Sequence, residues 1–197
     1  MKLLIIISAI ILLIFIAIQI FMSVNDTEER KYKLILKENN FEIRYYPSAI
    51  LATITSEARS YKELSNPGFR KLADYIFGNN ETGEKIAMTT PVQMDINDTV
   101  SSMSFVMPSD YSENNLPKPN NPEVIIEKTK EEYIAVIRFG GFASDKDISE
   151  NTIKLQKILE EKGIKYYGNF RYLGYNPPYQ LIGRRNEIIV SVTWNNP

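Results

Sequence analysis

The sequence predicts an α+β domain built from two similar halves, preceded by an apolar N-terminal segment. Two amphipathic helical patterns lie about eighty residues apart, and each is preceded and followed by two strand-like runs. The order ββαββ therefore occurs twice, with a Pro- and Asn-rich linker at residues 110–122 between the halves. Each unit would leave an apolar sheet face for the other to cover. We therefore expect one pseudo-symmetric domain of eight antiparallel strands and two helices.

Composition narrows the possible chemistry. The 197 residues are 44% apolar and 24% charged, which suits one domain plus an appendage. The net charge of −1 argues against nucleic acid as the main partner. Cysteine and histidine are both absent, so the chain lacks a thiol nucleophile, the usual general base and the usual haem ligand. We therefore expect a binding protein, not an enzyme.

The N-terminal segment is long and apolar. Residues 3–22 are interrupted only by Ser8 and Gln19, and about 20 such residues span a hydrocarbon core. We predict a transmembrane anchor over residues 1–24. A removed signal peptide is the alternative, but the exit from the apolar run lacks a small-residue cleavage site.

Residues 25–40 are polar and are predicted to be a tether to a folded domain over 41–197. The chain is thus expected to be a single-pass membrane protein. Basic residues follow the apolar run and would retain the domain in the cytoplasm if they decided the orientation. Long C-terminal domains cross largely regardless of charge, so we expect the domain on the non-cytoplasmic side.

The first half begins with two strand patterns. Residues 41–46 alternate apolar and polar side chains, and residues 49–55 are rich in β-branched and apolar residues. Pro47 and Ser48 between them suggest a turn and hence a hairpin. Two further strands are expected over 85–94 and 103–107, with Pro91 at an edge or bulge because it cannot donate a ladder hydrogen bond.

The first helix is predicted from its punctuation and its apolar stripe. Asn66 is the expected N-cap and Pro67 the first helical residue, and Gly78 is expected to end the helix in a left-handed conformation. The stripe that faces the core consists of Phe69, Leu72, Ala73, Ile76 and Phe77.

The second half repeats this order. Residues 124–127 and 133–139 suggest a hairpin, and residues 166–172 and 187–194 suggest two later strands. Ser144 and Asp147 resemble a capping box at the start of the second helix. Its stripe is Ile148, Thr152, Leu155 and Leu159, and Gly163 is expected to end it.

A rigid loop over residues 173–179 (LGYNPPY) is the feature most suggestive of a ligand site. Paired prolines and a flanking glycine hold it extended between two β-rich runs, which suits the rim of a pocket. Aromatic and methionine side chains could line an apolar cleft, although each on its own is more typical of core packing. The sequence therefore predicts an apolar ligand cleft with this loop at its rim.

Seven segments resemble the SOUL haem-binding protein family. In family order they are residues 41–46 (FEIRYY), 85–92 (KIAMTTPV), 105–108 (FVMP), 116–119 (LPKP), 138–142 (RFGGF), 174–178 (GYNPP) and 183–187 (GRRNE). Together they cover about residues 41–194. The resemblance implies a twisted antiparallel β-barrel of two repeats. It also implies non-covalent binding of haem or a related tetrapyrrole, without established catalysis.

The resemblance also implies a set of site residues. Family members proposed to ligate iron through histidine place it in the first-strand motif, where this chain has Tyr45. Tyrosine can ligate haem iron as a phenolate, and a packed or pocket-lining role for Tyr45 is the alternative. The resemblance places the cleft between the first helix and the loop near residues 175–181. The residues expected to contact the ligand are Tyr45, Phe69, Leu72, Ala73, Ile76, Met88, Tyr175, Tyr179 and Leu181.

Basic groups near the propionates are a further feature of the family. The matching positions here are Asn66, Asp74 and Gln180, none of which is a cation. Lys71, Arg184 and Arg185 are possible substitutes. The predicted function is therefore a membrane-anchored domain that binds haem or another tetrapyrrole in an apolar cleft. A module for another small hydrophobic ligand, or an interaction scaffold at the membrane, are the alternatives.

Overall fold

The computed structural model describes residues 2–24 and 27–194, and in the first helix it describes side chains only for residues 6–8 and 10–18. The predicted anchor and tether, and the end of the predicted domain, therefore fall partly outside the described residues. The helices are α1 (Lys2–Val24), α2 (Tyr61–Ile76) and α3 (Asp145–Glu161). The strands are β1 (Lys33–Lys37), β2 (Glu42–Tyr46), β3 (Ile50–Ser56), β4 (Val92–Asp95), β5 (Ser101–Val106), β6 (Ile125–Lys128), β7 (Glu132–Phe139), β8 (Tyr166–Gly174) and β9 (Asn186–Val192).

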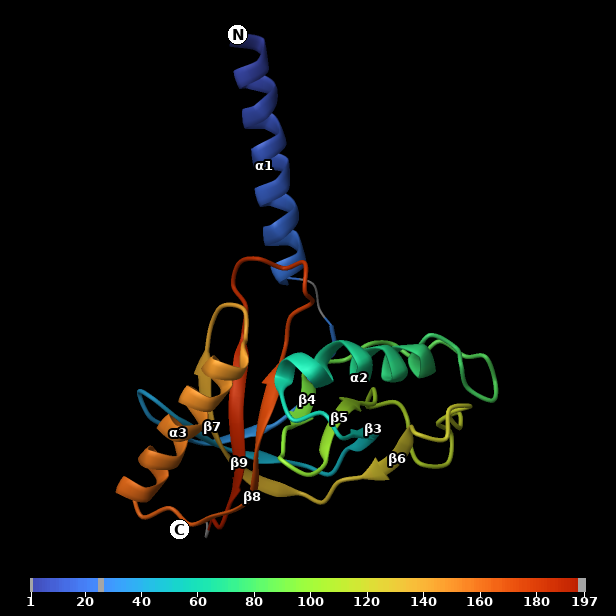
Figure 1. The fold of residues 1–197 in the computed structure, drawn as a ribbon, viewed down its shortest axis with the longest axis vertical. Helices are drawn as coiled ribbons and strands as arrows, with labels where there is room; N and C mark the ends of the chain where they lie inside the picture. Colours follow the sequence, from blue (N-terminus) through green and yellow to red (C-terminus); the bar gives the residue numbers. More distant parts are fainter. Residues whose placement is uncertain (1, 25–26, 195–197) are drawn as a thin grey trace.

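The described strands form one twisted antiparallel sheet in the order β1-β2-β7-β9-β8-β4-β5-β3-β6 (Figure 1). From β2 onwards, the chain order is ββαββ twice, as predicted. The sheet order from β2 to β6 is symmetric: when each strand of the first half (β2, β3, β4, β5) is renamed as its counterpart in the second half (β6, β7, β8, β9) and the reverse, the same order is obtained, read from the other end. The pseudo-symmetric repeat is therefore present, and its axis passes between β8 and β4.

Both predicted hairpins are wrong. β2 pairs with β7, with Ile43 opposite Ala135, and β3 pairs with β6, with Ala52 opposite Ile126. The segment between β2 and β3 and the segment between β6 and β7 do not form hairpin turns. They hydrogen-bond to each other instead, since the Thr129 amide donates to the Ala49 carbonyl at 2.8 Å. Pro47 contributes, because its fixed φ keeps the chain extended. Each half therefore contains the first strand of the other.

The sheet is open, so the prediction of a closed barrel is also wrong. Closure would need β2 to pair with β6, but β1 occupies the free edge of β2 and leaves β6 at the opposite edge. β1 lies in the segment predicted to be a tether, where Ile35 and Leu36 pack against the core. The short, charged β6 is typical of an unpaired edge.

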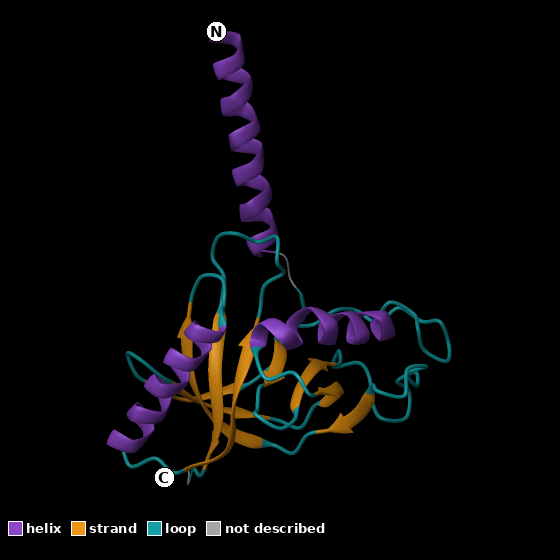
Figure 2. Ribbon diagram, in the orientation of Figure 1, coloured by secondary structure: helices purple, strands orange, loops and turns teal. Residues whose placement is uncertain are grey.

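α2 and α3 contribute to one large apolar core on the same side of the sheet (Figure 2). α2 begins six residues earlier than predicted, because the Ser60 side chain accepts from the Glu63 amide and is the true N-cap. Leu64, in the added turn, is buried. A Cβ on Gly68 would lie 3.1 Å from Met103 Cε, so this glycine allows α2 to approach the sheet closely.

The other helix signals are confirmed. Ser144 and Asp147 form the capping box of α3, each accepting from the other's backbone amide. Gly78 and Gly163 follow their helices with φ of 117° and 66°, in the left-handed region that favours glycine. These boundaries depend on local chemistry that the sequence displays directly.

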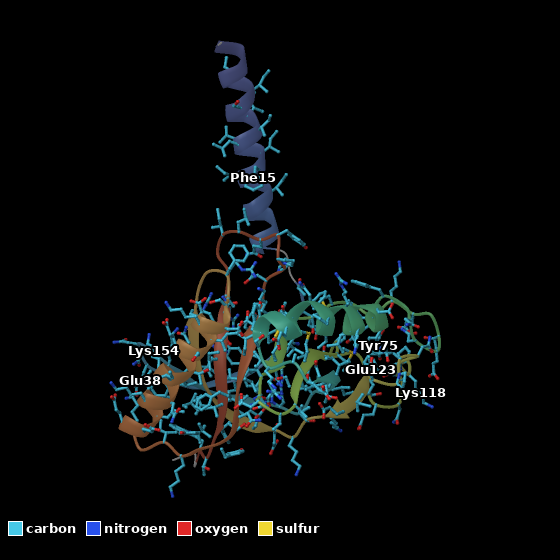
Figure 3. All side chains as sticks on the ribbon, in the orientation of Figure 1. Phe15, Glu38, Tyr75, Lys118, Glu123 and Lys154 are labelled. Atoms are coloured by element: carbon cyan, nitrogen blue, oxygen red, sulfur yellow. The ribbon has the colours of Figure 1, made fainter. Side chains whose placement is uncertain are left out.

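α1 extends away from the domain (Figure 1), and Phe15 projects from its side (Figure 3). Within the part of the chain that the structure describes, no helix combines the length and the apolarity needed to cross a bilayer. The predicted transmembrane helix is therefore not found among the described residues.

Candidate ligand-binding site

The predicted contact residues on α2 are mostly covered. Leu72 is 0% exposed, and Ile76 and Ala73 are also buried. Leu72 and Ile76 belong to the main core between α2 and the sheet. Phe69 differs, since 39% of it is exposed while its ring meets Phe105 edge-on at 5.2 Å. In this conformation a ligand on α2 would therefore meet Phe69 and not the three residues beneath it.

Met88 lies in the segment that joins α2 to β4. The predicted strand over 85–94 is formed only at Val92–Asp95, and Pro91 precedes it after a cis peptide bond. The Ile86 amide donates to the Ile76 carbonyl at 2.8 Å, which ties this segment to the end of α2. Met88 is half-buried against the same core as α2. Met88 therefore packs against the same core as Leu72 and Ile76.

Tyr45 lies elsewhere, near the end of β2. Its ring contacts Tyr133 at 5.3 Å, and its hydroxyl donates to Glu131 Oε2 at 2.6 Å. Arg44 points to the opposite face of the sheet, as alternation predicts. The hydrogen bond to Glu131 raises the pKa of Tyr45. A phenolate ligand needs the opposite shift, so the geometry favours a packed, neutral tyrosine.

The loop after β8 is braced by Arg184. Its guanidinium donates to the carbonyls of Pro177 at 2.6 Å and Gln180 at 2.7 Å, and it lies 4.3 Å from the centre of the Phe142 ring. Tyr179 and Leu181, at 62% and 50% exposed, present surface on this loop. The predicted rigidity is therefore explained by the arginine as well as by the prolines.

The structure separates Tyr175 from the α2 residues. Tyr175 is buried in a second, smaller cluster with Tyr46 and Leu173, on the other face of the sheet. Its hydroxyl donates to Glu187 Oε2 at 2.8 Å. Burial raises the pKa of Tyr175 well above its ordinary value, so it stays a neutral donor. Tyr175 is thus part of an internal polar network.

The cations suggested for propionates are all engaged. Lys71 pairs with Glu123 at 2.9 Å on the surface of the domain (Figure 3 labels Glu123). Arg185 pairs with Glu187 and donates twice to Glu29, at 2.9 and 3.0 Å. Exposed pairs such as that of Lys71 exchange readily, whereas Arg185 and the bracing Arg184 are held by several partners. Lys71 is therefore the most available of the three.

A buried charge cluster was missed from the sequence. Glu187 is 0% exposed and receives two hydrogen bonds from Arg44, one from Arg185 and one from Tyr175. Burial alone would raise the pKa of Glu187, but hydrogen bonds and charge from Arg44 and Arg185 hold it below its ordinary value. A signal was present, since a carboxylate within the apolar run 186–192 requires a buried partner.

Two hollows lie outside the predicted cleft. One, of about 470 Å³, lies between the segment before β1 and the chain on either side of Met107. The other, of about 500 Å³, lies between the start of α3 and the middle of β8. Among the described residues, no group of three carboxylates could hold a metal ion.

The structure defines a class of protein: an α+β domain of two repeats that exchange their first strands, with a hollow large enough for a small molecule and a buried ionic cluster. The sequence profile described as SOUL heme-binding protein matches residues 27–191. The chain belongs to this family. "Heme-binding protein 2" of Homo sapiens is 32% identical over 157 residues, which are 76% of each chain. "Heme-binding protein 1" of Xenopus laevis is 28% identical, over 82% of this chain and 90% of its own.

Solved structures share the fold at low identity. The C-terminal domain of EcmrR has a TM-score of 0.60 at 10% identity, covering 79% of this chain and 98% of its own. An uncharacterized conserved protein from Listeria innocua has a TM-score of 0.59 at 9% identity, covering 79% and 93%. A hydrolase from the same organism gives 0.57 at 8%, covering 80% and 94%. At these identities the likeness concerns the fold alone.

Proposed function

We propose that the folded domain binds haem or a related tetrapyrrole non-covalently and without catalysis. The observation that carries this proposal is family membership over residues 27–191, with relatives named as haem-binding proteins. The absence of histidine leaves apolar contact as the main means of holding the ring. The predicted contact residues with surface in this conformation are Tyr45, Phe69, Met88, Tyr179 and Leu181.

We propose that the iron receives no ligand from Tyr45. The support is the hydrogen bond from its hydroxyl to Glu131, which raises the pKa of Tyr45 away from the range in which a phenolate forms. When bound, haem would supply its own redox and ligand chemistry. The chain would orient the ring against Phe69 and shield it from water. Lys71 would leave its surface ion pair with Glu123 and pair with a propionate of the haem instead.

Absorbance titration of the full chain with haemin tests both statements. We expect a saturable shift of the Soret band that Tyr45→Phe leaves unchanged in position. Phe69→Asp should weaken binding about ten-fold or more, because it places a charge against an apolar ring. Phe77→Asp is the matched control, since Phe77 is also exposed but caps the end of α2. If the Soret band of the Tyr45→Phe protein lay at a different wavelength from that of the unsubstituted protein, Tyr45 would be an iron ligand and this proposal would be wrong.

A membrane tether with the domain on the non-cytoplasmic side is a separate proposal. It rests on the apolar run 3–22, on the exposure of side chains such as Leu12 and Phe15 in α1, and on the flanking charge pattern. Carbonate extraction of membranes tests the tether, and protease protection of sealed vesicles tests the side. Release of the full chain into the carbonate supernatant would contradict the tether.

A further inference from the structure

The hollow beside Met107 lies apart from α2. Its volume is about 470 Å³, within the range typical of small-molecule sites. Its walls come from four stretches of the chain: the segment before β1, the link between β2 and β3, the chain after β5, and the end of β6 at Lys128. None of the contact residues predicted from the family resemblance lines it. This hollow is therefore a different place from the proposed tetrapyrrole site.

The lining combines an apolar body with basic groups. Ala49, Ile50, Val106, Met107 and Pro108 supply apolar wall. The charged residues in the lining are Arg30, Lys31, Lys128, Glu28 and Glu113, so cations outnumber carboxylates by one. Lys128 and Glu113 pair with each other at 3.6 Å. The surplus positive charge therefore belongs to Arg30 and Lys31, which follow each other on the segment before β1.

Arg30 says more than Lys31 about what the hollow could bind, because its guanidinium is removed from water and has no carboxylate partner. Nη2 donates to the Pro47 carbonyl at 3.3 Å and to Thr129 Oγ1 at 3.5 Å, and the guanidinium lies 4.7 Å from the centre of the Tyr46 ring. Its Nε is buried and has no hydrogen-bond acceptor, and no carboxylate lies within ion-pair distance of it among the described residues. Burial lowers the pKa of Arg30, and nearby Glu132 is already paired with Arg171 at 2.9 Å.

A guanidinium without a carboxylate partner favours an oxyanion as a charged acceptor. The surplus of one cation matches a monoanion better than a phosphate monoester, which carries nearly two charges. The apolar wall and the volume match a hydrocarbon body. We propose that this hollow binds an amphipathic monocarboxylate, of the fatty-acid class, with its head group at Arg30 and Lys31. This goes beyond the proposed tetrapyrrole function and does not depend on it.

Photo-crosslinking of the full chain with a diazirine-bearing fatty acid tests the proposal, because mapping the label separates site binding from partition into detergent or lipid. We expect label within residues 47–50 and 106–114. Dodecanoic acid should compete for it, and methyl dodecanoate should compete about ten-fold less well, since the ester lacks the charge. Arg30→Gln should reduce labelling at these positions about ten-fold, and Lys146→Gln, which removes an exposed cation of α3, should not.

Two further variants keep the test decisive if Arg30→Gln fails to fold. Lys31→Gln and Lys128→Gln remove exposed lining cations, and far-UV circular dichroism checks that they fold. The first should reduce labelling more than the second, because Lys128 already has a carboxylate partner. Labelling that the methyl ester competes equally well would overturn the proposal. So would label displaced by haemin in proportion to haemin binding, which would make this hollow the tetrapyrrole site.

Discussion

Arg44 and Glu187 form a doubly hydrogen-bonded ion pair in the interior, although 143 positions separate them in sequence. Nη1 lies 2.8 Å from Oε2 and Nη2 lies 3.0 Å from Oε1. The Arg44 guanidinium also lies 4.2 Å from the centre of the Tyr32 ring. β2 carries Arg44 and β9 carries Glu187, and β7 separates these strands in the sheet. The pair therefore links the first strand of one half to the last strand of the other.

Removing one member of this pair should be costly. Glu187→Ala removes the buried carboxylate that Arg44 and Arg185 share, and leaves them only the more exposed Glu42 and Glu29. We expect a loss of about 3 kcal/mol in the free energy of unfolding, because these remaining partners compensate part of the buried charge. The double variant Arg44→Met with Glu187→Leu should lose less than the sum of the single losses, because no charge is left uncompensated. Urea denaturation of all three variants measures this. Strictly additive losses would show that the pair is not coupled.

The same pair predicts how stability depends on pH. The pKa of Glu187 is held below its ordinary value of 4.5 by Arg44 and Arg185, despite burial that acts in the opposite direction. A depressed carboxyl pKa stabilises the folded state above the unfolded pKa, and this contribution is lost as the pH falls through the folded value. We expect stability to fall below roughly pH 4.5. Glu187→Gln should flatten that fall, and an unchanged slope would assign it to other groups, such as Glu132.

The start of α2 can be tested by its caps. Ser60→Ala removes the acceptor for the Glu63 amide and should cost about 1 kcal/mol. Asn66→Ala should be near neutral, because Asn66 is exposed inside the helix and caps nothing. Thermal unfolding of the two variants compares these sites directly. A larger effect at Asn66 would favour the boundary predicted from the sequence.

Gly68 tests the close packing of α2 on the sheet. A Cβ there would lie 3.1 Å from Met103 Cε and 3.3 Å from Ile54 Cδ1. Gly68→Val should destabilise the fold by about 1–3 kcal/mol through overpacking. Gly163→Val is a control of another kind, since a Cβ there meets open space and any loss reflects its positive φ alone. Refined positions of Met103 in the Gly68→Val protein would show whether the neighbour or the helix moves.

Local patterns predicted most elements but not their pairing. The alternation around Ile43 and the capping box at Ser144 depend on neighbours within a few residues, so they are visible in the sequence. Strand partners depend on contacts across the whole chain, so the exchange of β2 and β6 between halves was not predictable from the links near Pro47 and Thr129. The start of α2 was placed too late because proline favours the first helical turn, whereas the structure places Pro67 inside the helix, where it forgoes one backbone hydrogen bond.

The candidate site was predictable only in outline. The stripe on α2 was correctly recognised as apolar, but the sequence does not distinguish a ligand cleft from the core, and Leu72 proved to be core. Phe69 is exposed because the buried face of α2 centres on Gly68, Leu72 and Tyr75, and Phe77 is exposed because it is the C-cap beyond the helix. The Arg44–Glu187 pair was missed because each residue was weighed on its own strand. Whether the predicted contact residues bind a ligand stays a prediction.

The central claim is that a tetrapyrrole is held by apolar contact and not by coordination of its iron. Parallel titrations of the full chain with haemin and with metal-free protoporphyrin IX, followed by absorbance, test it most directly. The account predicts saturable binding of both, with dissociation constants that agree within about three-fold, since loss of a metal–ligand bond would change them far more. Binding of haemin alone would contradict apolar retention, and binding of neither would contradict the proposed function.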